Sequence, residues 1–165
     1  MLEWLTQLKH SNNQEIRHSN NQEMYTYKYP RPAVTADCVV IGQTGDGSRK
    51  VLLIRRGQEP YKDCWAFPGG FLNMDETLEE CARRELKEET GLTATGEMVE
   101  LKSFSTVDRD PRGRTITVAY LVEMPLTEAR GSDDADEARW FPLDELPPLA
   151  FDHDEILKVA LAKIQ

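Results

Sequence analysis

The sequence predicts an α/β fold in which helices cover a mixed β-sheet. Three observations lead to this class: short apolar segments separated by turn-forming residues, two segments with helical apolar periodicity, and an ordinary globular composition. Of the 165 residues, 39% are hydrophobic and 30% are charged, and the net charge is −9. A chain of this length can form one domain with a substantial core.

Five apolar segments have the length and composition of strands: 33–41, 51–54, 99–106, 115–122 and 138–142. Turn-forming residues separate them. Residues 42–49 read GQTGDGSR, and residues 110–113 have the Asp-Pro-x-Gly order of a type I turn. Residues 55–71 are predicted to form a loop. We therefore expect a sheet built from these five strands.

Two helices are predicted. For the first, over residues 78–90, Thr77 is the expected N-cap and Glu80 completes a capping box. Gly91 is suited to end this helix in the left-handed conformation. The second helix is indicated by an apolar stripe near the C-terminus, made of Ile156, Leu157, Ala160, Leu161 and Ile164.

The first predicted helix carries carboxylates on its inward side. That side is marked by three apolar residues, Leu78, Ala82 and Leu86. At about 100° per residue, Glu85 and Glu89 fall in the same sector, and Glu88 lies at its margin. The outward side holds charged residues that suit water: Glu79, Glu80, Arg83 and Lys87. Arg84 points to another sector, so we expect it to relieve only part of the repulsion among the inward carboxylates.

Buried carboxylates need a partner, because an unpaired buried charge is costly. A divalent cation would supply one, since Mg²⁺ takes oxygen ligands and is commonly shared with substrate phosphates. Gly69 and Gly70 precede the helix, and glycine allows backbone to approach a ligand closely. The spacing therefore favours a metal site over the alternative, a purely structural acidic helix.

Composition also limits the partners and the location. A net charge of −9 disfavours free nucleic acid as a partner. No apolar run approaches the roughly 18 residues that cross a bilayer, and the N-terminus lacks a secretory pattern. The cysteines, Cys38, Cys64 and Cys81, are odd in number and lack metal-type spacing. We expect a cytoplasmic protein with reduced cysteines.

The N-terminal segment differs from the rest of the chain. Residues 10–25 contain a polar direct repeat, HSNNQEIR followed by HSNNQEMY. Two copies are too few for a repeat architecture. We therefore expect residues 1–24 to form a tail or weak helix, and residues 25–165 to form the folded domain.

Residues 70–92 resemble the Nudix box. Gly70 is followed after five residues by Glu76, and after seven more by RELKEETGL, residues 84–92. The likeness runs from about residue 30 to the C-terminus. The segments PYKDCWAFPGGF, DRDPRGRTITVAY and WFPLDELPPLAFDH resemble the ADP-ribose pyrophosphatase branch of the family. The resemblance implies a Nudix-type α/β/α sandwich around a mixed sheet.

The resemblance also implies an activity and a cofactor. We expect hydrolysis of a nucleoside diphosphate derivative with Mg²⁺ as cofactor, or Mn²⁺ as a substitute, and ADP-ribose yielding AMP and ribose 5-phosphate is the leading reaction. By motif position, Gly70, Glu85, Glu88 and Glu89 would bind the metal. Arg84 would orient the glutamates.

Two roles stay open within this family pattern. Glu76 is expected to hold the loop and helix together by contacting Arg84. Glu85 could take a proton from water, but family members often draw the base from a later loop. There Glu137 is the preferred candidate, ahead of Asp134 and Asp136, and a solvated acidic loop is the alternative.

Candidate substrate-binding residues are more scattered. Three arginines around the turn at Pro111 could bind phosphate or ribose, and they are Arg109, Arg112 and Arg114. Arg55 is a further candidate for phosphate. Phe67 could stack on adenine, as could Trp65, Tyr25 and Tyr27; the alternative for each aromatic residue is packing.

Two other functions remain possible at this point. The first is hydrolysis of an ordinary or oxidised nucleoside triphosphate, because the same box serves both reactions. The second is an ADP-ribose sensor without turnover, as in related domains fused to a winged helix. The chain ends at Gln165, one helix after the Nudix-like region, which disfavours a DNA-binding sensor. Homodimers are common in this branch of the family, and this protein could also form one.

Overall fold

The computed structural model describes residues 26–130 and 135–164. The chain divides into two compact units, residues 1–32 and residues 33–165. All helices and strands of the described residues belong to the second unit. The tail or weak helix expected over residues 1–24 lies outside the described residues.

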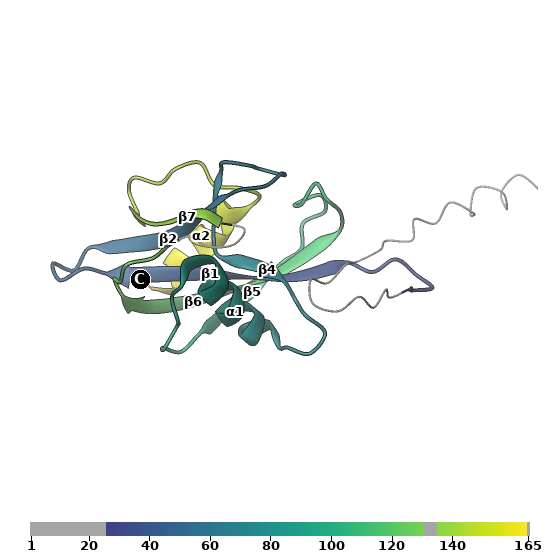
Figure 1. Ribbon diagram of the computed structural model, residues 1–165, viewed down its shortest axis with the longest axis horizontal. Coiled ribbons are helices and arrows are strands. Elements are labelled where there is room, and N and C mark those ends of the chain that lie inside the picture. Colours follow the sequence, from purple (N-terminus) through teal and green to yellow (C-terminus); the bar gives the residue numbers. More distant parts are fainter. Residues whose placement is uncertain (1–25, 131–134, 165) are drawn as a thin grey trace, which may run out of the picture. The chain divides into compact units, whose positions relative to one another are not determined.

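The second unit contains one mixed sheet (Figure 1). Its strands are β1 (Ala33–Gln43), β2 (Arg49–Arg56), β3 (Trp65–Ala66), β4 (Gly69–Phe71), β5 (Val99–Phe104), β6 (Thr115–Pro125) and β7 (Ala135–Pro142). The order is β3-β2-β1-β6-β5, with β4 paired to β1 and β7 paired to β2. β1 and β6 run parallel and the other pairs are antiparallel, so the predicted mixed sheet is confirmed.

The two helices, α1 (Leu78–Thr90) and α2 (His153–Lys163), cover opposite faces of the sheet (Figure 1). Strand alternation produces the two faces. Cys38 and Val40 of β1 pack in the cluster that contains Leu86 of α1. Val39, between them, packs with Ile156 of α2. The result is an α/β/α sandwich, as expected.

The short strands β3 and β4 were missed, since residues 55–71 are predicted above to form a loop. The segment around Pro68 has no apolar alternation of its own, and pairing with long strands makes it extended. Cys38 N–H donates to the Pro68 carbonyl at 2.8 Å, and Leu72 N–H donates to the Val34 carbonyl at 3.0 Å. This pairing fixes β4 beside α1, which matters for the site described below.

The ends of α1 are those that its sequence predicts. The Thr77 side chain accepts the Glu80 N–H, and the Glu80 carboxylate accepts the Thr77 N–H at 2.7 Å, which completes the capping box. Gly91 ends the helix with φ of 72° and donates its N–H to the Lys87 carbonyl. Among the described residues, no helix is long and apolar enough to span a membrane.

Candidate active site

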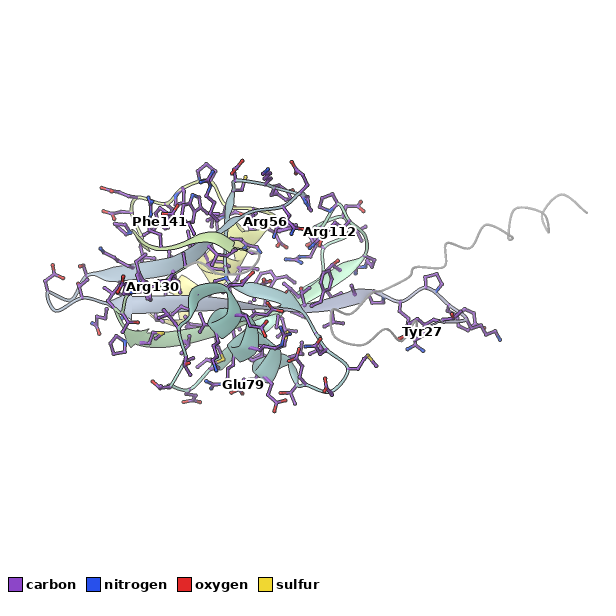
Figure 2. All side chains as sticks on the ribbon, in the orientation of Figure 1. Tyr27, Arg56, Glu79, Arg112, Arg130 and Phe141 are labelled. Carbon is purple, nitrogen blue, oxygen red and sulfur yellow. The ribbon has the colours of Figure 1, made fainter. Side chains whose placement is uncertain are left out.

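The carboxylates of α1 lie as the helical phase predicts. The Glu85 side chain is 14% exposed, whereas Glu88 at the margin is 50% exposed. Glu89 lies one turn after Glu85 and is partly buried. Figure 2 shows Glu79 pointing away from the sheet. The inward placement of Glu85 and Glu89 is therefore confirmed.

The Arg84 side chain reaches carboxylates outside its own sector of the helix. Its Nε and Nη2 atoms bind the two carboxylate oxygens of Glu76 at 2.9 and 2.6 Å. Its Nη1 atom lies 2.6 Å from Glu85 Oε1 and 3.0 Å from Glu88 Oε2. Among the described residues Arg84 pairs with Glu76, Glu85 and Glu88 but not with Glu89, so the expected partial relief of the inward carboxylates is confirmed. The hydrogen bonds from Arg84 are the main reason why the pKa of Glu76 is lowered to about 2.

The two glycines of β4 allow this strand to touch the carboxylates. The Gly69 N–H donates to Glu89 Oε2 at 2.9 Å. A Cβ atom at Gly70 would overlap the Glu85 carboxylate, and one at Gly69 would overlap Asp37. The Gly70 carbonyl accepts a weak hydrogen bond from the Cys81 thiol at 3.7 Å. A larger residue at Gly70 would therefore displace Glu85 or the strand.

Burial makes both inward carboxylates hard to ionise. It raises the pKa of Glu89 to about 8, and the nearby charges of Glu85 and Asp37 add to this effect. The pKa of Glu85 is also raised, mainly by burial, although Arg84 opposes the shift. Such groups gain from a cation that compensates their charge. Hard carboxylate oxygens suit Mg²⁺ or Mn²⁺, so the donor atoms fit a divalent metal.

Within the described residues, no group of three or more His, Cys, Asp or Glu side chains is arranged as a metal site. Arg84 is one reason why these carboxylates are not grouped as metal ligands, since its Nη1 atom binds both Glu85 and Glu88. The assignment of Gly70, Glu85, Glu88 and Glu89 as metal ligands thus stays a prediction.

The three arginines around the β5–β6 turn have different roles. Arg109 is 5% exposed and forms a two-pronged ion pair with Asp152. Arg114 donates to the carbonyls of Ser105 and Thr106 at 2.9 and 3.3 Å. These contacts hold the turn in place. Arg109 is buried in its ion pair, whereas Arg114 is exposed and its role in binding substrate stays a prediction.

Arg112 is exposed and lies beside Phe71. It binds the buried Asp110 through Nε and Nη2, and its guanidinium carbon lies 5.2 Å from the centre of the Phe71 ring. Because Phe71 directly follows Gly70, Arg112 borders the carboxylate site. The predicted turn is also present, since the Gly113 N–H donates to the Asp110 carbonyl at 3.3 Å.

Arg56 is nearer to the carboxylates than the predicted Arg55. Arg55 forms an exposed ion pair with Asp63 at 2.6 Å. The pKa of Arg56 is lowered, mainly by burial and also by the charge of Arg112. The negative charge of Glu89 opposes this shift, so Arg56 lies near Glu89. Strand alternation could have shown that Arg56, and not Arg55, faces α1. Leu52 packs on the α1 side, and residues separated by an even number of positions along a strand share a face.

Two predicted site residues lie away from the carboxylates. Phe67 is 2% exposed and its ring stacks on His153, with the ring centres 5.0 Å apart. It is a core side chain and is not available to stack on adenine.

Glu137 of β7 pairs with Arg139, and Phe141 on the same side of β7 packs in the core beneath α2. Glu137 therefore lies on the α2 side of the sheet, and the structure does not bring it to Glu85. Its proposed role as a base stays untested. Asp134 and the side chain of Asp136 lie outside the described residues.

This combination defines a class of protein: an α/β/α sandwich whose first helix presents inward glutamates to a glycine-rich strand. Residues 31–160 match the sequence profile of the NUDIX domain. The match covers most of the chain, and the protein belongs to the NUDIX domain family.

Known relatives agree with this assignment. The chain is 43% identical to the ADP-ribose pyrophosphatase of Methanocaldococcus jannaschii over 130 residues, which cover 79% of this chain and 73% of the relative. A MutT/nudix family protein from Enterococcus faecalis has a similar crystal structure, with a TM-score of 0.79 and 34% identity; the likeness covers 85% of this chain and 64% of that one. The NUDIX domain of Shewanella oneidensis NrtR, solved with ADP ribose, gives a TM-score of 0.77 at 29% identity, and the likeness covers 83% of this chain and 91% of that one.

Proposed function

We propose that this protein is a divalent-metal-dependent hydrolase that cleaves ADP-ribose to AMP and ribose 5-phosphate. The observation that carries the proposal is the position of two partly buried carboxylates, Glu85 and Glu89, with Arg56 near Glu89 and Arg112 over Phe71, the residue after Gly70. A diphosphate needs positive groups for its oxygens, and the carboxylates can hold a cation that adds to them. The relative named ADP-ribose pyrophosphatase and the ADP-ribose complex of a similar structure support this choice of substrate.

The carboxylates would act on the metal and on water. A bound Mg²⁺ or Mn²⁺ would neutralise phosphate charge and make water more acidic. Glu85 and Glu89 would hold the cation, together with Glu88 and the Gly70 carbonyl. Arg84 would orient Glu85 through the 2.6 Å ion pair.

Proton transfer and phosphate binding would use different residues. Glu85 is the favoured proton acceptor, because its carboxylate lies against Gly70, among the groups that would hold the cation and its water. Arg56 and Arg112 would bind phosphate oxygens, since a guanidinium can donate two parallel hydrogen bonds to one phosphate. The two arginines come from the end of β2 and from the β5–β6 loop, as Figure 2 shows.

A substrate panel tests the proposal against the two alternatives. We expect ADP-ribose to give the highest kcat/KM among ADP-ribose, NADH, a sugar nucleotide and an oxidised dGTP. Chromatography should show AMP and ribose 5-phosphate in equal amounts. Faster hydrolysis of the oxidised dGTP would instead assign a triphosphate pyrophosphohydrolase. Tight binding of ADP-ribose without turnover in either Mg²⁺ or Mn²⁺ would assign a sensing module.

Metal should stabilise the folded protein as well. An ion that binds the native state alone stabilises it by about 2.7 kcal/mol at a hundredfold excess over its Kd. We expect millimolar Mg²⁺ to raise the Tm in differential scanning fluorimetry, and a non-hydrolysable ADP-ribose analogue to enlarge the rise. Glu89→Gln should shrink it. Equal metal responses of the variant and the wild type, with analogue binding unchanged by a chelator, would contradict the assigned metal site.

A further inference from the structure

Phe151 belongs to the segment that connects β7 to α2 along the chain, and its backbone has an unusual conformation. Its φ is +54°, in the left-handed region that residues with a side chain seldom adopt. Such a conformation is unfavourable and persists where the surroundings enforce it. The neighbours on both sides are anchored: the Ala150 N–H donates to the Trp65 carbonyl at 2.8 Å, and Asp152 is paired with Arg109.

The strained position directs the Phe151 ring toward two arginines. The guanidinium carbon of Arg56 lies 4.9 Å from the ring centre, and that of Arg112 lies 5.6 Å from it. Both distances are within the range of an attractive cation–π interaction. Tyr61 packs against the same ring with a centre-to-centre distance of 4.7 Å.

Two guanidinium groups held this close repel each other. Arg112 is one reason why the pKa of Arg56 is lowered, after burial. Arg56 donates to the Pro60 carbonyl at 2.9 Å but forms no ion pair among the residues that the structure describes. A shared aromatic ring attracts both cations without neutralising either one. Arg112 also pairs with Asp110 through Nε and Nη2, so Arg56 supplies the uncompensated charge and Arg112 can add its Nη1 donor.

We propose that Phe151 is a positioning residue that holds Arg56 and Arg112 together as one site for the two adjacent phosphates of the substrate. The proposal rests on the proposed function, and it adds a reason for preferring a diphosphate to a monophosphate. One arginine can bind one phosphate, whereas two arginines fixed beside one ring match a pair. The ring acts through the arginines and does not itself take part in hydrolysis.

Replacing Phe151 with leucine removes the aromatic face and keeps an apolar side chain. We expect Phe151→Leu to raise KM for ADP-ribose about tenfold, which corresponds to about 1.4 kcal/mol, with kcat changed less than about threefold. Calorimetry in Mg²⁺ should show a larger loss of affinity for α,β-methylene ADP than for AMP. Phe151→Tyr, which restores the ring, should restore both properties.

Tyr61→Leu is the matched control, because Tyr61 touches the same ring but neither arginine is stacked on it. Its KM should stay within about threefold of the wild-type value. If Phe151→Leu loses its native circular dichroism, Phe151→Met replaces it in the same measurements. Equal losses of AMP and α,β-methylene ADP affinity, or an unchanged KM in a folded variant, would overturn the proposal. The binding measurements need no turnover, so a wild-type protein that binds the analogue but does not cleave ADP-ribose would refute the proposed function alone.

Discussion

Glu89→Gln is expected to reduce turnover of ADP-ribose at least a hundredfold while the fold is kept. A hundredfold loss corresponds to about 2.7 kcal/mol of activation free energy, a reasonable cost for removing one metal-binding charge. Glutamine keeps the shape of the side chain and can still accept the Gly69 N–H, so the packing of α1 should not change. Turnover and circular dichroism measured on the same preparation would check this result.

The same variant should alter the pH dependence of stability. The pKa of Glu89 is about 8 in the folded protein and near 4.5 in the unfolded chain. The folded state therefore binds more protons between these values, and metal-free wild-type protein should lose stability as the pH rises from about 4.5 to about 8. Denaturant unfolding in a chelator should show that Glu89→Gln loses less stability over this range, with the remainder due to Glu85, whose pKa burial also raises.

Glu79→Gln is the matched control for Glu89→Gln. Glu79 is on the same helix but is exposed and paired with Arg83, and exposed pairs contribute little. We expect near wild-type turnover and an ordinary metal response from it. If Glu89→Gln keeps more than about a tenth of wild-type turnover, Glu89 is not a metal ligand in the reaction.

Arg84→Gln should give the largest loss of stability, on the order of 2 to 3 kcal/mol at neutral pH. The substitution removes the partner of Glu76, whose side chain is 12% exposed, and the shared partner of Glu85 and Glu88. Activity should fall too, because Glu85 loses the group that orients it. Equilibrium urea unfolding would measure the change in the free energy of unfolding.

The loss caused by Arg84→Gln should depend on pH in a defined direction. The pKa of Glu76 is about 2 in the folded protein, against an ordinary value of 4.5. Its ion pair therefore contributes fully above pH 4.5, and the contribution disappears as the pH falls toward 2. Arg130→Gln, at an exposed pair with Glu128, should leave stability unchanged. A difference between Arg84→Gln and wild type that stays constant from pH 7 to pH 3 would contradict this account.

Local sequence was sufficient to predict α1. Thr77 and Gly91 specify its ends through contacts with residues three or four positions away, and helical phase alone places Glu85 inside. The mixed sheet was also predictable, because β1 and β6 are long apolar segments. Features of this kind depend on neighbours along the chain.

The rest of the site depends on contacts that local sequence does not contain. β4 is extended because it pairs with β1, and its own residues carry no strand pattern. The reach of Arg84 to Glu85 and Glu88 could not be read from helical phase, which gives the direction of the Cα–Cβ bond and not the place where a long side chain ends. The sequence leaves Phe67 as a candidate for stacking on adenine. In the structure His153, 86 positions away, stacks on the Phe67 ring, and its Nδ1 atom accepts the Phe67 backbone N–H. The roles of such residues can be assigned only after the strands and helices have been placed against one another.

The Cys81 thiol lies beneath β4, within hydrogen-bonding distance of the Gly70 and Phe71 carbonyls. Burial raises its pKa to about 12, so almost none of it is thiolate at neutral pH. Peroxides and alkylating reagents attack the thiolate, and this sulfur is therefore chemically inert although it sits next to the carboxylates. We therefore expect Cys81 to stay unmodified when the folded protein is treated with peroxide or an alkylating reagent.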